Sequence, residues 1–173
     1  MSHKHCAWLA VATAAILTGT GATHFVDASA QRSAARPSVA PSTASPTNGQ
    51  IAALFDRWNA ALATGDAHRV ADLYAPDAVL LPTVSARIRT TRPEIVDYFQ
   101  HFLQNKPVGR IQRRIIKVLN RTAAIDTGLY QFTLTSGNGH KSTVNARYTF
   151  VYELRGGRWL IVNHHSSTVP AGD

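Results

Sequence analysis

The end of the chain carries the strongest constraint on the fold, two strand-like runs joined by a pair of glycines. Residues 144–154 and 159–167 are rich in β-branched and aromatic side chains, which favour strands. Gly156 and Gly157 lie in the short connection between them and can adopt the positive φ angles of a tight turn. The pattern predicts a β-hairpin that ends the folded part of the chain.

The second run of this hairpin closes with four polar residues, HHSS at 164–167. Strand side chains alternate, so His164 and Ser166 share one face while His165 and Ser167 share the other. Burying polar groups without partners is costly. At least one of the two faces is therefore expected to border water, a pocket or another subunit.

The region after Pro107 is predicted to be strand throughout. Residues 110–119 and 123–135 form two further runs, separated by turn sequences from each other and from the hairpin. A long antiparallel sheet is expected from this half of the chain.

The preceding half is predicted to be mainly helical. Residues 51–62 carry apolar side chains at helical spacing, and Asp66 can cap a second, shorter helix whose apolar positions extend to Tyr74. A short strand follows at 78–81. Thr91 then caps a third helix, with Pro93 in its first turn and Glu94 completing a capping box.

Helices followed by a long antiparallel meander indicate an α+β fold. The sheet has one large apolar partner, the set of helices, so they must cover one of its faces. We expect a cone-shaped, curved antiparallel sheet wrapped around three N-terminal helices, with a pocket between the two layers.

The chain is predicted to contain three segments. Residues 1–30 resemble an export signal, with a basic start, an apolar stretch and an Ala-Ser-Ala cleavage site ending at Ala30. Residues 31–48 are rich in Pro, Ser and Ala and read as a disordered tether. Residues 49–170 form the folded domain. The protein is expected to be periplasmic or secreted after cleavage near Ala30.

The net charge of the protein excludes few classes of function. The formal charge is +8 over 173 residues, yet the basic residues are scattered and charged residues make up only 16%. No zinc-finger spacing, phosphate-binding loop or dinucleotide fingerprint is present. We expect no nucleic-acid partner and no cofactor.

Three stretches resemble one known family. They are LYAPDAVLLPT at 73–83, ARYTFVY at 146–152 and HHSS at 164–167. All three are similar to bacterial relatives of the calcium/calmodulin-dependent protein kinase II association (hub) domain. This family lies within the nuclear transport factor 2-like superfamily, beside polyketide-cyclase-like and ketosteroid-isomerase-like proteins.

The resemblance implies a cone-shaped barrel with a pocket and self-association, as a homodimer or larger, through the outer face of the sheet. Kinase catalytic motifs are absent from the sequence, and no calmodulin binding is expected. The arginines of the animal hub pocket align with Phe150 and Ser166 here, so its preference for acidic ligands does not carry over.

Two residues are candidates for catalysis, His164 and Tyr148. A histidine suits proton transfer near neutral pH, and a tyrosine can donate to a developing oxyanion. Three roles stay open for His164: a structural hydrogen bond, acid–base chemistry or metal binding. A metal is not predicted, because adjacent strand histidines point to opposite faces and cannot easily share one ion.

A ligand pocket is predicted from side chains expected to face the space between helices and sheet. Arg147 lies in an otherwise apolar strand and needs an anionic or carbonyl partner, either within the protein or on a ligand. The predicted pocket residues are Trp58, Tyr74, Tyr98, Arg147, Phe150, Tyr152 and Ser166.

These observations favour an exported, self-associating, non-catalytic module with a pocket for an unknown small molecule. The alternative is a small cyclase- or isomerase-type enzyme that acts on a hydrophobic carbonyl compound through His164 and Tyr148.

Overall fold

A computed structural model describes residues 44–83 and 85–171 of the chain. The predicted export signal and the predicted tether up to residue 43 lie outside the described residues. Within them, no helix combines the length and the apolar character needed to cross a membrane.

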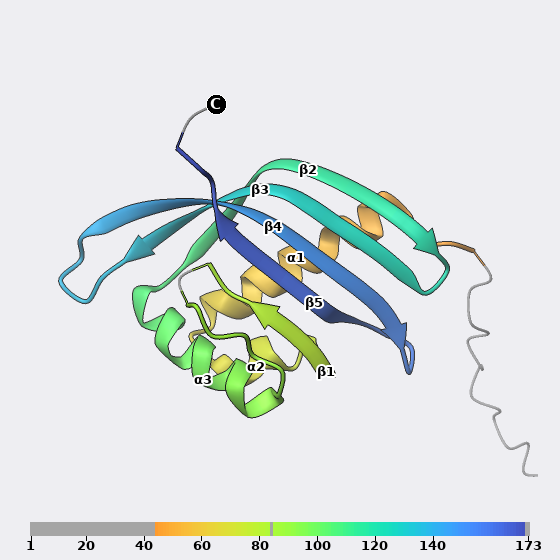
Figure 1. Ribbon diagram of the computed structural model, residues 1–173, viewed down its shortest axis with the longest axis horizontal. Helices are drawn as coiled ribbons and strands as arrows, with labels where there is room; N and C mark the ends of the chain where they lie inside the picture. The colour runs from red at the N-terminus through yellow and green to blue at the C-terminus, as the bar shows by residue number, and fades with distance from the viewer. Residues whose placement is uncertain (1–43, 84, 172–173) are drawn as a thin grey trace, which may run out of the picture. The chain divides into compact units, whose positions relative to one another are not determined.

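Five strands form one strongly curved sheet (Figure 1). The strand order is β1-β5-β4-β3-β2, and three neighbouring pairs are antiparallel. The strands are β1 (Tyr74–Leu81), β2 (Val108–Asn120), β3 (Ala123–Thr135), β4 (Lys141–Arg155) and β5 (Arg158–Thr168). The expected curved α+β sheet is confirmed, with one difference: β1 pairs with β5 in parallel, so the sheet is mixed.

Three α-helices lie on one side of this sheet (Figure 1). They are α1 (Asn48–Ala63), α2 (Ala67–Ala71) and α3 (Arg92–Phe102), and α3 continues into the single 3₁₀ turn η1 (Leu103–Asn105). α1 packs against β2 and β3, whereas α3 packs against β1 and α2. The helices therefore cover the inner face of the sheet, and no helix of the described chain covers the outer face.

The local signals at the helix ends agree with the expectations. Gly65 has φ +70 after the end of α1, and the Asp66 side chain accepts from the backbone of His68 at the start of α2. The Glu94 carboxylate in the first turn of α3 accepts from the backbone N–H of Thr91 at 3.2 Å. These bonds satisfy N–H groups that a helix start leaves unpaired.

The extent of the second helix was predicted wrongly. α2 ends at Ala71, and Tyr74 is the first residue of a strand that begins four residues before the expected one. The cause is tertiary: Tyr74 pairs with Ile161 of β5, and Leu81 pairs with His165. Pro76 and Asp77 lie where this register shifts, which is where a strand tolerates a proline.

The core lies between the helices and the inner face of the sheet. Alternate residues of β3 and β4 point inward, which places Tyr130, Tyr148 and Phe150 against Phe55 of α1. The Trp58 ring is 1% exposed and packs edge-on against Phe150 with a centroid distance of 5.3 Å. An aromatic cluster of this kind fixes the distance between α1 and the sheet.

Candidate functional site

A small cavity lies between α1, α3 and the inner face of the sheet. Its volume is about 30 Å³, which holds about one or two water molecules and no larger ligand without side-chain movement. The walls are mostly apolar and aromatic. The lining residues are Trp58, Leu80, Pro82, Thr83, Tyr98, Phe99, Phe102, Tyr130, Phe132, Leu134, Val144, His164 and Ser166.

A buried chain of hydrogen bonds favours one tautomer of His164. Trp58 Nε1 lies 3.1 Å from the Tyr74 hydroxyl, which lies 2.9 Å from His164 Nδ1. An indole can only donate, so the Tyr74 oxygen accepts from Trp58, and we assign the Tyr74 hydrogen to Nδ1 because this pairs it within the buried site. The proton of the neutral imidazole is therefore assigned to Nε2. Nε2 is buried and has no hydrogen-bond partner within the described chain.

The environment of His164 keeps its ring neutral. The residue is 4% exposed, and Phe150 stacks on the imidazole with a centroid distance of 4.0 Å. Burial, with a smaller contribution from His165, lowers the pKa of His164 to about 3. A base this weak is poorly matched to proton transfer at neutral pH. His164 thus offers the cavity an N–H donor instead of a titrating group.

Three hydroxyl groups form the second polar feature of the cavity. The Tyr130 hydroxyl donates to Ser166 Oγ at 2.5 Å, and Ser166 Oγ also hydrogen-bonds Thr83 Oγ1. The strand pattern at β5 predicted Ser166, whereas Tyr130 and Thr83 were not predicted. Tyr130 shares its strand parity with Phe132, and Thr83 ends the stretch at 73–83, but only the folded chain brings them to Ser166.

The structure places four of the predicted residues on the cavity wall, namely Trp58, Tyr98, His164 and Ser166. Three others sit behind the wall: Tyr74 holds His164, Phe150 stacks on it, and Tyr152 stacks on Phe150 at 5.7 Å. These three are packing and positioning residues rather than lining residues.

Tyr148 does not line this cavity, contrary to expectation. Its hydroxyl donates to Asp126 Oδ1 at 2.9 Å, and Asp126 Oδ2 forms an ion pair with Arg114 Nε at 3.2 Å. Asp126 is fully buried, and this burial raises the pKa of its carboxyl, although the bond from Tyr148 and the Arg114 charge act the other way. The hydroxyl of Tyr148 is thus hydrogen-bonded to the buried Asp126 carboxylate and not to His164.

Arg147 is also not a pocket residue. It lies on the outer face of the sheet, is exposed, and has no ion-pair partner within the described residues. The structure does not bring Arg147 to the predicted pocket, because no helix of the described residues covers the face of β4 that carries it. Arg147 instead lines an open groove of about 580 Å³ on the outer face, together with Arg113, Ile115, Leu129 and His165.

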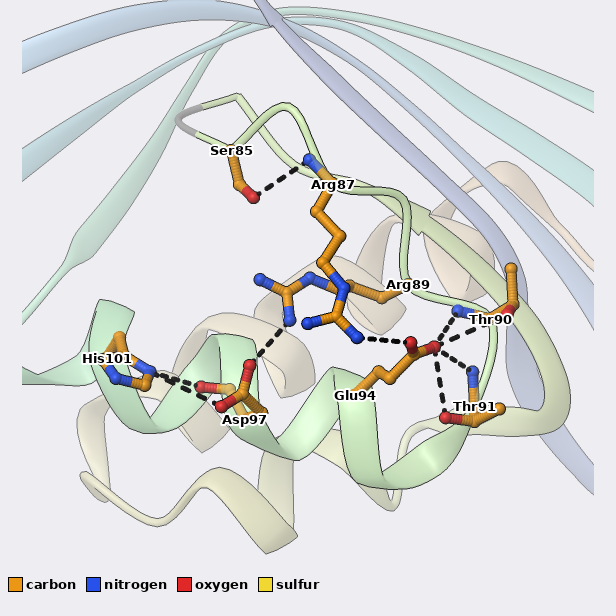
Figure 2. A network of polar contacts seen from close by, with 8 residues as sticks. All are labelled: Ser85, Arg87, Arg89, Thr90, Thr91, Glu94, Asp97 and His101. Atoms are coloured by element: carbon orange, nitrogen blue, oxygen red, sulfur yellow. Dashed lines mark hydrogen bonds and ion pairs between the residues drawn. The ribbon is translucent and has the colours of Figure 1, made fainter.

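The loop between β1 and α3, whose Pro82 and Thr83 line the cavity, is fastened to α3 by ion pairs (Figure 2). Arg87 Nη2 lies 2.8 Å from Glu94, and Arg89 Nη1 lies 2.6 Å from Asp97. Arg89 is itself held to β1, since its backbone exchanges hydrogen bonds with Leu80. The aromatic residues of α3 are thereby held against the cavity.

A metal centre has no support from the described residues, where no group of three or more His, Cys, Asp or Glu side chains converges. His164 and His165 point to opposite faces of β5, one buried and one exposed.

Residues 47–170 match the family model described as the calcium/calmodulin dependent protein kinase II association domain. A crystal structure from Xanthomonas campestris, of a protein described as a calcium/calmodulin dependent protein kinase II association domain, is 58% identical to this chain. The similarity covers 76% of this chain and 94% of that chain, with a TM-score of 0.71. A comparison with curated proteins found no match.

More distant structures share the fold alone. The association domain of C. elegans CaMKII is 14% identical with a TM-score of 0.57, covering 69% of this chain and 94% of that one. A dehydratase-like protein of the NTF2-like family from Streptomyces avermitilis is 14% identical with a TM-score of 0.64, covering 71% of this chain and 96% of that one. The fold thus occurs both in an association domain and in a protein described as an enzyme.

Proposed function

The chain belongs to the calcium/calmodulin dependent protein kinase II association domain family, and from this premise we propose that it is a self-associating module whose inner cavity binds a small molecule without transforming it. The proposal that the cavity binds its ligand without catalysis rests on the protonation state and surroundings of His164. It is neutral, weakly basic and walled by aromatic rings. No carboxylate lines the cavity within the described chain.

The alternative, an isomerase-type enzyme that uses His164 and Tyr148, has less support. The Tyr148 hydroxyl is bonded to Asp126, and Phe150 stacks on His164. Proton carriers in a single reaction need to reach the same substrate. In this structure His164 lines the cavity and Tyr148 does not.

Self-association is proposed to use the outer face of the sheet. The open groove on this face includes Leu129 and Ile115, and Ile115 is 44% exposed although it lies in a strand. An apolar surface on a sheet without covering helices is typical of an interface. The family's name as an association domain points the same way.

The unmodified protein is expected to be a dimer or larger by size-exclusion chromatography with light scattering. Ile115→Lys adds a positive charge beside Arg113 and Arg147 of the groove, and it should shift the assembly toward monomer by at least tenfold in dissociation constant. Ile88→Lys is the matched control, because Ile88 is 52% exposed on the β1–α3 loop, away from the outer face. A strictly monomeric unmodified chain at tens of micromolar would exclude self-association.

We also propose that the protein is exported and cleaved after Ala30, on the strength of the apolar stretch and the Ala-Ser-Ala sequence before Gln31. N-terminal sequencing of the protein from its host is expected to begin at Gln31. Recovery of the protein from every cell fraction with Met1 as its first residue would contradict export.

A further inference from the structure

The donors of the inner cavity define the kind of molecule it accepts. We infer that the ligand is uncharged and mainly apolar, carries one hydrogen-bond acceptor such as a ketone, ester or amide oxygen, and enters by displacing the Tyr98 and Phe102 rings. This inference rests on the proposed ligand-binding function and specifies its chemistry.

The requirement for an acceptor follows from a count of hydrogens. Nε2 of His164 carries a proton and has no partner in the described chain. The three hydroxyls of Tyr130, Ser166 and Thr83 carry three hydrogens. The two hydrogen bonds among them use two of these hydrogens and leave one free. Two donors are therefore free at the cavity. Leaving a buried donor unpaired costs about 1–3 kcal/mol, which an acceptor atom on a ligand would recover.

His164 and Ser166 sit two residues apart on the same face of β5, which separates their backbones by about 6–7 Å. Side chains at these two positions project from the same face, so their donors can flank one bound oxygen. The surrounding wall is apolar, so the rest of the molecule has to be hydrocarbon or aromatic.

The requirement for zero charge follows from the ion pairs around the cavity. No charged side chain of the described residues lines it. The buried Arg89 and the partly buried Arg114 already have carboxylate partners, Asp97 and Asp126 (Figure 2 shows the first pair). A carboxylate in the cavity would be buried without a counterion, which is far more costly than burying a carbonyl.

The route of entry follows from a second space on the other side of two rings. Tyr98 and Phe102 line both the inner cavity and an outer cleft of about 230 Å³. The two rings are stacked at 5.7 Å, only partly buried, and within the described chain no hydrogen bond holds the Tyr98 hydroxyl. Rotation of these side chains joins the two spaces without any change in the sheet, and the combined volume suits a single aromatic ring.

The inference is tested with three probes of one shape: acetophenone, ethylbenzene and benzoate. Binding to the mature protein is measured at pH 7.5 by two-dimensional amide NMR titration. Acetophenone is expected to bind about fivefold more tightly than ethylbenzene, since one hydrogen bond contributes about 1 kcal/mol. Benzoate is expected not to bind. In His164→Phe, which removes one of the two free donors, the advantage of acetophenone should shrink while ethylbenzene still binds, and Phe102→Ala should strengthen the binding of both by opening the entry.

The outcomes separate the two levels of the proposal. Benzoate binding most tightly, or ethylbenzene equalling acetophenone on the unmodified chain, overturns the inferred ligand class while the cavity remains a binding site. Failure of all three probes on both the unmodified chain and Phe102→Ala overturns ligand binding by the cavity itself. The comparison of the three probes on the unmodified chain tests the inferred ligand class even if His164→Phe does not fold.

Discussion

Gly128→Ala is expected to destabilise the protein by at least about 3 kcal/mol, because the middle of the sheet has no room for a methyl group. Gly128 lies in β3 between β2 and β4, where it pairs with Arg114 and Tyr148. A Cβ at this position would lie 2.0 Å from the backbone carbonyl oxygen of Arg113. That oxygen belongs to a strand and cannot retreat without disrupting hydrogen bonds of the β2–β3 ladder.

The measurement is the free energy of unfolding in urea, with Gly137→Ala as the matched control. Gly137 lies in the β3–β4 turn, and a Cβ there would meet no atom within 4 Å. The control should stay within about 0.5 kcal/mol of the unmodified chain. A Gly128→Ala protein as stable as this control would show that β2 and β3 are not as close as the structure has them.

Acid is expected to weaken the folded state through His164 at a rate of about 1.4 kcal/mol per pH unit below pH 6.5. Burial lowers the pKa of His164 from 6.5 to about 3 in the folded protein. Between these two values the unfolded chain binds a proton that the folded chain does not. Stability from this residue is therefore complete above pH 6.5 and falls as the pH drops toward 3.

His164→Phe removes the titrating group and keeps a ring against Phe150. Its unfolding free energy should fall less steeply with acid, so that the two proteins differ by about 3 kcal/mol more at neutral pH than at pH 4.5. Chemical denaturation at a series of pH values measures this difference. Parallel pH profiles for the two proteins would mean that the imidazole binds its proton as readily in the folded chain as in the unfolded chain.

Much of the architecture was predictable because its signals are local. The β-branched and aromatic runs after Pro107 are the strands β2 to β5, and Gly156 and Gly157 adopt φ +56 and +76 in the last turn. Thr91 and Glu94 start α3 as their spacing indicated. Each of these depends on side chains only a few positions apart in the sequence.

The features that were missed depend on partners far apart in the sequence. Tyr74 fits a helical pattern, but its pairing with β5 makes it a strand residue. Arg147 alternates correctly along β4, yet the pattern did not reveal which face the helices cover. The pairing of Asp126 with Arg114 and Tyr148 joins three strands, and no spacing within one strand predicts it.

The parallel pairing of β1 with β5 also bears on how the chain is made. A ribosome releases β1 long before β5, so the edge of β1 waits for its partner until nearly the whole domain has been synthesised. Until then the early helices have only an incomplete sheet to pack against. Contacts of such long sequence separation slow folding, and a nascent chain of this protein cannot complete its sheet until its last strand emerges.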